Sequence, residues 1–294
     1  MPTEILEERA RAAVARLESC DLCPRRCGVN RLQDERGFCR IGRHARVNSF
    51  VPHFGEETPL VGRSGSGTIF FCGCNLSCVF CQNYDISQLN QGREVSAETL
   101  ARMMLALQRK GCHNINFVTP THVVPQILEA LVLARADCLH IPLVYNSGGY
   151  ESVETLLLLE GIFDVYLPDA KYGSDEPAQK YSRAPHYTQF MKSAIREMHR
   201  QVGDLVLDEC GIAVRGLMVR HLVLPAGIAG TDEVIRFLSQ EVSTNTYLNI
   251  MSQYRPEYNA CRFSELDRNI TETEFCDALR LAAQAGLTRG LAIL

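Results

Sequence analysis

Short apolar runs alternate with helical stretches along most of this chain, and this alternation constrains the fold more than any other feature. Such an alternation is typical of parallel strands that are joined by helices. Helix caps support it, with Ser96 and Thr231 expected as N-caps and Thr271-Glu-Thr-Glu274 as a capping box. The sequence therefore predicts an α/β fold, a partial (βα)6 TIM-like barrel. Its expected strands span residues 68–72, 114–119, 141–145, 163–167, 217–224 and 247–251.

The chain before residue 67 has a different character, and we expect two parts. Residues 1–66 are predicted to form an N-terminal helix and a cysteine-rich segment, and residues 67–294 the barrel. Residues 45–67 are rich in glycine, proline and polar residues, which predicts irregular structure or short hairpins. Within the barrel, residues 204–214 are expected to form a hairpin, and residues 291–294 a final edge strand.

Composition excludes some classes of function. The net charge of −4 gives no electrostatic reason to expect a nucleic-acid partner, because such domains usually carry a basic patch. Charged residues interrupt the richest apolar stretches, so no membrane span is expected. The N-terminal residues have a charged helical pattern rather than that of a signal peptide. We therefore expect a soluble, cytoplasmic protein whose 13 cysteines are reduced.

Three cysteines, Cys74, Cys78 and Cys81, stand at C-x3-C-x2-C spacing in a loop after the first apolar run. Three close thiolates can hold a [4Fe-4S] cluster and leave one iron open to another ligand. The alternative is a structural zinc site, which would need a fourth ligand such as Cys72 or Cys112. The spacing after a strand favours the cluster.

A second cysteine set has C-x2-C-x3-C-x11-C spacing and comprises Cys20, Cys23, Cys27 and Cys39. Four ligands favour a closed structural site, either zinc or an auxiliary iron–sulfur cluster, and the sequence leaves the metal open. The surrounding segment has few apolar residues, so a metal would supply much of its folding energy. Four free thiols are the alternative. Seven arginines between residues 25 and 46 also make this segment basic, which indicates a solvated face or a surface that steers an acidic partner.

The three-cysteine loop, with Phe80 before its last cysteine, resembles the signature of radical S-adenosylmethionine (SAM) enzymes. The resemblance covers about residues 67–251, and Cys81-Gln82-Asn83 resembles pyruvate formate-lyase activating enzymes and their uncharacterised relatives. It implies a [4Fe-4S] cluster that cleaves SAM reductively to a 5′-deoxyadenosyl radical, with flavodoxin or ferredoxin as the one-electron donor. The radical would then abstract hydrogen from a substrate, such as a glycine of a glycyl radical enzyme.

Ligands of α/β barrels bind at the carboxyl ends of the strands, where the resemblance implies residues that bind SAM. Asp169 and Lys171 resemble the family's Asp-x-Lys motif, although an ordinary ion pair would also explain them. Arg220 resembles a strand arginine that binds the SAM carboxylate. Because a buried unpaired charge is costly, we expect this guanidinium to face an anion.

Other positions at the strand ends match the family less closely. Asn146 and Ser147 stand where the family has Thr-Asn-Gly, and they are expected near the ribose unless they only form a tight turn. Most members have Gly-Gly-Glu where this chain has Thr119-Pro-Thr-His122. The hydroxyl of Thr119 or Thr121, or a strand carbonyl, would then accept from the SAM amino group. His122, Gln253 and Tyr254 are candidates for shaping the substrate pocket.

The sequence leaves two other functions open. The chain could modify another peptide or a small molecule, since residues 82–111 contain no cysteine and so lack the ferredoxin-like insert of many activases. It could instead be a non-catalytic zinc or iron–sulfur scaffold. A scaffold gives no reason for Asp169, Lys171 and Arg220 to converge on Cys74, Cys78 and Cys81, so their placement distinguishes the hypotheses.

Overall fold

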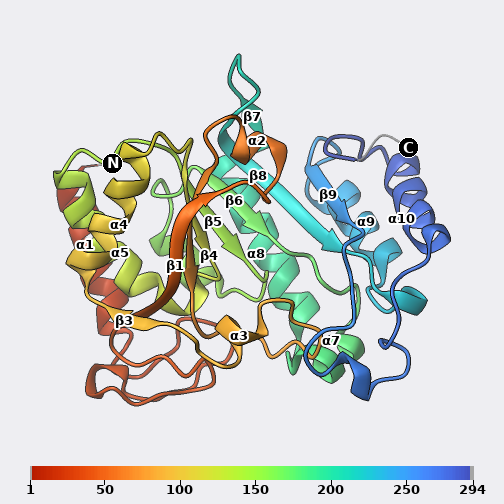
Figure 1. Cartoon of the computed structure of the whole chain (residues 1–294), viewed down its shortest axis with the longest axis horizontal. Coiled ribbons are helices and arrows are strands. Elements are labelled where there is room, and N and C mark those ends of the chain that lie inside the picture. Colours follow the sequence, from red (N-terminus) through yellow and green to blue (C-terminus); the bar gives the residue numbers. More distant parts are fainter. Residues whose placement is uncertain (1, 292–294) are drawn as a thin grey trace.

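The computed structural model describes residues 2–291, and in these residues one nine-stranded sheet forms the centre of the molecule (Figure 1). Six neighbouring strands run parallel and form the partial barrel, and each corresponds to a predicted strand. They are β2 (Ser66–Phe71), β4 (Ile115–Val118), β5 (Leu143–Ser147), β6 (Val165–Pro168), β8 (Ala213–Leu222) and β9 (Tyr247–Met251). The α/β barrel prediction is therefore confirmed.

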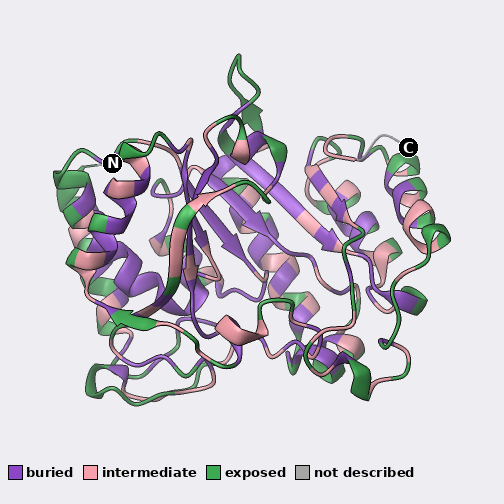
Figure 2. Cartoon of the chain, in the orientation of Figure 1, coloured by how far each residue is buried: buried purple, intermediate pink, exposed green. Residues whose placement is uncertain are grey.

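Helices cover the outer face of the sheet and bury its larger apolar cluster, as the purple strands and inward helix faces in Figure 2 show. Among them, α1 and α4 pack on α5, α6 packs on α8, and α9 packs on α10. The main helices are α1 (Thr3–Ala15), α4 (Ala97–Arg109), α5 (Val124–Ala136), α6 (Val153–Leu158), α7 (Asp175–Ser182), α8 (Tyr187–Val202), α9 (Thr231–Glu241) and α10 (Glu272–Gln284).

Two of the three expected helix caps are present. The Ser96 side chain accepts from the Thr99 N–H, and Thr271 and Glu274 form the capping box of α10. The expectation for α9 is wrong by one residue, because Gly230 is the N-cap and adopts a left-handed conformation. The Thr231 hydroxyl is instead hydrogen-bonded to His221 Nε2 at 2.9 Å.

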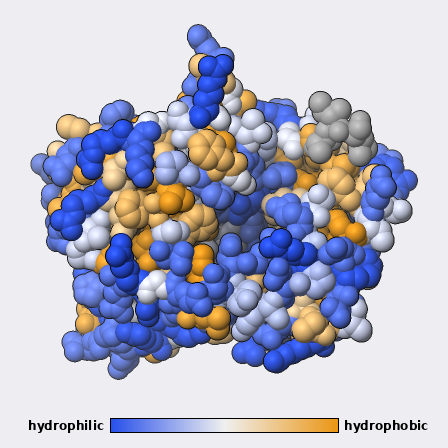
Figure 3. All heavy atoms as spheres, viewed as in Figure 1, coloured by the Kyte–Doolittle hydropathy of each residue, from blue (hydrophilic) through white to orange (hydrophobic). Residues whose placement is uncertain are grey.

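The prediction of irregular structure or short hairpins over residues 45–67 is only partly right, because most of its first half is a long strand. β1 (Ala45–His53) runs antiparallel to β2, and β3 (Arg93–Val95) pairs with the other side of β1. Polar and apolar residues do not alternate regularly along β1, so its sequence does not indicate a strand. Its backbone forms hydrogen bonds to the strands on both sides, β2 and β3. Figure 3 shows hydrophobic side chains gathered over the part of this face that β1 crosses. The sheet thus begins before residue 67, and the division into two domains stays a prediction.

The inner face of the barrel is closed at the amino ends of its strands. The short helix α2 (Thr58–Val61) places Leu60 against a second apolar cluster that includes Val144, Val165 and Met218. These strand residues alternate with those that face the helices. α2 therefore plugs one end of the barrel and leaves its carboxyl end for ligands.

The remaining predicted elements lie at the edges. β7 (Val206–Leu207) pairs with β8 in the expected hairpin. Residues 292–294 of the expected final edge strand lie outside the described residues. The cysteine-rich segment between α1 and β1 contains one short helix, η1 (Arg31–Gln33), and lies below β3 in Figure 1. No helix in residues 2–291 is long and apolar enough to cross a membrane.

Candidate active site

The three-cysteine loop follows β2 at the carboxyl end of the parallel strands. Cys78 is buried, and Cys74 and Cys81 are half-buried. The end of α7 anchors the loop, because Ser77 N–H donates to the Ser182 carbonyl at 3.1 Å and Val79 N–H donates to the Tyr181 carbonyl at 2.8 Å. The loop is therefore held against an element about a hundred residues further along the chain.

Each cysteine sulfur in this loop has a polar neighbour. The Ser182 hydroxyl donates to Cys78 Sγ at 3.0 Å, and the Leu76 N–H donates to Cys74 Sγ at 3.3 Å. Cys81 Sγ lies 3.1 Å from the Ser87 hydroxyl. Burial raises the pKa of the Cys78 thiol to about 11, although the nearby Lys171 ammonium opposes this rise. Donors at the sulfurs suit thiolate ligands, whose charge they stabilise.

Within residues 2–291, no group of three or more histidine, cysteine, aspartate or glutamate side chains is arranged to hold a single metal ion. In a cubane cluster each thiolate binds a different iron, so its ligands do not converge on one ion. Three thiols on one anchored loop, each with a polar neighbour at its sulfur, fit such a cluster.

A cavity of about 250 Å³ adjoins this loop and gathers the charged residues that the sequence singled out. Phe80 forms part of its wall, and this ring is buried in edge-to-face contact with Tyr172 and Tyr254. The cavity is lined by Cys78, Phe80, Cys81, Gln82, Asn83, Asp169, Lys171, Arg220, Leu222, Met251 and Gln253. The two cysteines therefore share a space with both cations.

Asp169, directly after β6, joins the two cations of the cavity. Its Oδ2 accepts from Lys171 Nζ at 2.5 Å, and its Oδ1 accepts from Arg220 Nε at 2.8 Å. Burial alone would raise the pKa of Asp169, but the charges of Arg220 and Lys171 outweigh burial and hold that pKa below its ordinary value. The carboxylate stays ionised, and it lies between the two cations of the cavity.

Asn146, Ser147 and Thr119 lie beside the cavity rather than in its lining. Asn146 Oδ1 accepts from Arg220 Nη2 at 2.5 Å, so this residue contacts the charged group directly. The Ser147 hydroxyl accepts from the Gly149 N–H at 3.3 Å, as a turn residue does. Thr119 has a left-handed φ of 61°, and its N–H donates to the Asn146 carbonyl. The Thr121 hydroxyl donates to buried Glu151 at 2.6 Å.

Two of the three residues expected to shape the pocket lie elsewhere. His122 is buried, and its Nε2 is hydrogen-bonded to the Cys72 carbonyl at 2.8 Å, on the side of the N-terminal cysteines. Tyr254 is buried too, and it donates to the Leu266 carbonyl at 2.7 Å. Gln253 does line the cavity. The strand-end rule therefore located the right edge but not the direction of each side chain.

Sequence reasoning missed an acidic residue of this network. Glu56, between β1 and α2, reaches into the barrel, where its Oε2 lies 3.6 Å from Arg220 Nη1 and accepts from Asn146 Nδ2 at 3.4 Å. Arg220 thus faces two carboxylates of the chain. Asn116 of β4 was also missed, and both polar atoms of its fully buried amide have no hydrogen-bond partner in the described chain. No local pattern marks either residue, and the partners of Glu56 lie on other strands.

The N-terminal cysteines gather at a second place. Cys20, Cys23, Cys27 and Cys39 all line one small cavity of about 10 Å³, together with Arg31 and His122. Cys20, Cys23 and Cys39 are buried, and Cys27 is exposed. The sequence left four free thiols as an alternative, and the fold brings these four around one cavity.

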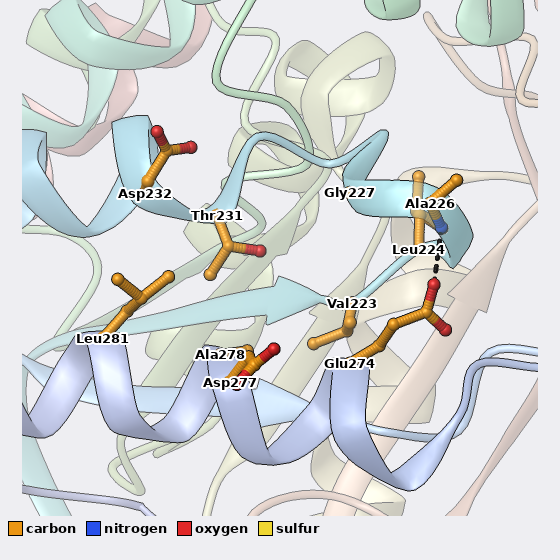
Figure 4. Close-up of a pocket in the computed structure, with 10 residues that line it drawn as sticks. All are labelled: Val223, Leu224, Ala226, Gly227, Thr231, Asp232, Glu274, Asp277, Ala278 and Leu281. Carbon is orange, nitrogen blue, oxygen red and sulfur yellow. Dashed lines mark hydrogen bonds between the residues drawn. The ribbon is translucent and has the colours of Figure 1, made fainter.

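A larger groove of about 360 Å³ lies outside the barrel between α10 and the turn η3 (Pro225–Gly227) that precedes α9 (Figure 4). One of its acidic side chains, Glu274, accepts from the Ala226 N–H at 2.7 Å and also pairs with Arg268. The groove contains none of the candidate site residues, and Glu274 has a structural role in it.

A cluster that is held by three thiolates leaves one iron free to bind a ligand in the adjoining cavity. The fold and the site therefore define a class of protein, an α/β barrel that can hold a small charged ligand against an open iron.

Comparison with known proteins identifies the family. The profile of the Radical SAM superfamily matches residues 68–212. The uncharacterized protein MJ0674 of Methanocaldococcus jannaschii is 36% identical over 293 residues, which cover 96% of this chain and 80% of that protein. A second uncharacterized protein of this organism, MJ0808, is 25% identical over 81% of this chain and 71% of its own length. This chain belongs to the radical SAM superfamily, which implies a [4Fe-4S] cluster and SAM.

A solved structure supports the fold. The chain superimposes on a radical SAM methyltransferase from Sphaerobacter thermophilus with a TM-score of 0.52 and 14% identity. The match covers 76% of this chain and 64% of that one, less than two thirds of its length. At this identity the likeness describes the fold alone.

Proposed function

We propose that this radical SAM enzyme abstracts hydrogen from a glycine of a glycyl radical enzyme, in the manner of pyruvate formate-lyase activating enzymes. The observation that carries the proposal is the common cavity of Cys78, Cys81, Asp169, Lys171 and Arg220. The bound cluster and SAM would supply one-electron cleavage to a 5′-deoxyadenosyl radical. The chain's own residues would bind and orient SAM and shield the radical.

Each charged residue has a separate task in this proposal. Lys171 and Arg220 are the cations available for the SAM carboxylate, and a planar guanidinium suits a carboxylate particularly well. Asp169 accepts hydrogen bonds from both cations and so holds them in place. As the hydrogen-bond acceptor nearest to the two cations, its carboxylate would also accept from the SAM amino group. Asn146 orients Arg220 and is expected near the ribose. Phe80 and its aromatic neighbours exclude water from one wall.

The size of the cavity supports a large substrate of which only one end enters the site. At about 250 Å³ it is below the roughly 300–1,000 Å³ of typical small-molecule pockets, so SAM alone would fill it. Gln82 and Gln253 stand at its lining, where Gln82 Nε2 donates to the Gln253 carbonyl at 2.8 Å. Side-chain amides can pair with the backbone of an extended peptide. A glycine on a loop of another protein therefore suits the site, and a one-electron donor such as flavodoxin or ferredoxin would complete the system.

The test is anaerobic. Protein reconstituted with iron and sulfide is mixed with dithionite, SAM and a pyruvate formate-lyase whose glycines carry deuterium at the α-carbon. We expect deuterium in the 5′-deoxyadenosine and a glycyl radical signal by electron paramagnetic resonance, both lost in Cys78→Ala. Deoxyadenosine without deuterium would instead indicate another peptide or a small molecule as substrate. If the parent forms no deoxyadenosine, the non-catalytic scaffold takes the place of the enzyme.

A further inference from the structure

The four N-terminal cysteines surround a cavity that also contains unsatisfied cationic groups. Arg31 is only 1% exposed, yet its Nη2 has no hydrogen-bond partner in the described chain. Its other nitrogens donate to the Gly42 and His122 carbonyls at 3.1 and 2.8 Å, and its Nη1 lies 3.7 Å from Cys20 Sγ. In residues 2–291 no carboxylate forms an ion pair with this guanidinium. Because a buried charge without a counter-ion is costly, we expect an anion to bind beside Arg31.

Arg25 repeats this pattern on the side of the cavity that faces the active-site loop. Its Nε donates to the Asn75 carbonyl at 2.8 Å, and its guanidinium lies 3.6 Å above the Phe38 ring. Its Nη2 is buried without a partner in the described residues. Outward-facing arginines of the same segment behave differently, since Arg36 pairs with Asp34 and Arg43 pairs with Glu129. Among the arginines of this segment, a buried Nη2 without a hydrogen-bond partner in the described residues occurs at Arg25 and Arg31, the two that line the cysteine cavity.

Four thiolates on a metal centre would provide the missing negative charge. A tetrahedral zinc site holds its four sulfurs at about 2.3 Å from one ion. The four cysteines line one cavity, yet within residues 2–291 no three histidine, cysteine or carboxylate side chains are arranged to hold a single ion. The cysteines are thus spread more widely than one zinc ion requires, as are the ligands of a multi-iron cluster, which bind different irons.

The two cysteine loops are also in direct contact. Gly73, with φ of 77°, precedes Cys74, and a Cβ added to it would lie 2.5 Å from the Cys39 carbonyl. Only glycine permits this approach. Arg25 binds the carbonyl of Asn75, the residue after Cys74. A centre in the N-terminal cavity would therefore lie beside the active-site cluster.

We propose that Cys20, Cys23, Cys27 and Cys39 bind a second iron–sulfur cluster, whose negative charge is balanced by Arg31 and Arg25. The proposal needs only this chain's thiols, iron and sulfide, and it is independent of the proposed glycine substrate. Exposed Cys27 marks the side of the cluster that faces solvent.

The experiment isolates this site by removing the other. A Cys74→Ala/Cys78→Ala/Cys81→Ala variant is reconstituted anaerobically with iron, sulfide and equimolar zinc. We expect it to retain about two to four iron ions and an equal amount of acid-labile sulfide, with a paramagnetic signal after reduction. Adding Cys23→Ala and Cys39→Ala should abolish the bound iron, the sulfide and the paramagnetic signal. The matched control adds Cys210→Ala and Cys261→Ala, which change exposed cysteines outside both sets, and it should leave all three readouts unchanged. Circular dichroism confirms that each variant is folded.

The midpoint potential of the second cluster tests the role of Arg31 separately. In the triple variant, Arg31→Met removes a buried positive charge and should lower the midpoint potential of the cluster, whereas Arg31→Lys should preserve most of it. A triple variant that takes up zinc without sulfide, or no metal at all, overturns the cluster. An unchanged potential in Arg31→Met overturns the role of Arg31. Since the triple variant cannot act on SAM, none of these results depends on the proposed function.

Discussion

Arg220 contacts three groups from three different parts of the chain, and its planar shape is what allows this. Nε points to Asp169, Nη2 to Asn146, and Nη1 to Glu56. A lysine would keep the charge but could not make these directed contacts together. At the scale of single residues, therefore, the contacts of Arg220 depend on the geometry of its guanidinium as much as on its charge.

Replacing Arg220 by lysine should weaken SAM binding by roughly tenfold, or about 1.4 kcal/mol, because the fork that faces a carboxylate is lost. Isothermal titration of the reconstituted protein with SAM measures this change. Arg215→Lys is the matched control, since Arg215 lies on the same strand but donates to the Gln201 carbonyl away from the cavity. An equal loss in both variants would contradict a direct role for Arg220.

Glu151 should make the protein less stable as the pH rises. Burial raises the pKa of this carboxyl from 4.5 to about 7, while hydrogen bonds from Thr121 and Tyr145 only partly oppose it. Between these two values the unfolded chain loses its proton first, so the free energy of unfolding falls by about 3 kcal/mol and then levels off. Urea unfolding of parent and Glu151→Gln across this range measures the effect. The variant should lack this part of the decline, and parallel curves would contradict the assignment.

At the scale of elements, the capping box fixes the start of α10. The Thr271 hydroxyl accepts from the Glu274 N–H at 3.1 Å, and Glu274 Oε2 accepts from the Thr271 N–H at 2.7 Å. Thr271→Ala should therefore lower the free energy of unfolding by about 1 kcal/mol, whereas Thr271→Ser should restore most of it. Chemical denaturation measures both. Thr273→Ala, an exposed change in the same turn, is the control and should cost less than Thr271→Ala.

The strands and the loops between them differ in how far the sequence predicts them. The six parallel strands follow from apolar runs buried on both faces, and the cysteine spacing and strand-end rule predict which residues meet at the cavity. β1 is not predictable in this way, because Asn48 and Ser49 interrupt its apolar pattern. Glu56 is missed for another reason. Its partners Asn146 and Arg220 are distant in sequence, and only the closed barrel brings them together.

At the scale of the whole molecule, the segment over residues 16–44 contacts the barrel through its own residues. The proposed second cluster would cross-link the segment to itself, because all four of its cysteines lie there. The segment contains only the short helix η1, and its small apolar cluster consists of Leu17, Cys20 and Leu22, with Val29 packed against it. Its links to the barrel run through side chains such as Arg31 to the His122 carbonyl and Arg43 to Glu129. Of the segment's other residues, Cys39 and Ile41 belong to the main apolar cluster. We expect a segment with so little apolar burial of its own to depend on a bound metal for its order.

Loss of the second cluster should therefore expose this segment to protease while the barrel stays folded. In a Cys23→Ala/Cys39→Ala variant, we expect trypsin to cleave between residues 25 and 40 at least about tenfold faster than in the reconstituted parent, because local opening there becomes less costly. Mass spectrometry of the fragments locates the cuts. The helices α4 and α8 contain tryptic sites in the barrel, and cleavage there should not change. Cys210→Ala/Cys261→Ala should behave as the parent does. Equal rates in parent and variant would show that the segment is ordered by its protein contacts alone, and general cleavage of α4 and α8 would show that the cluster stabilises the whole barrel instead.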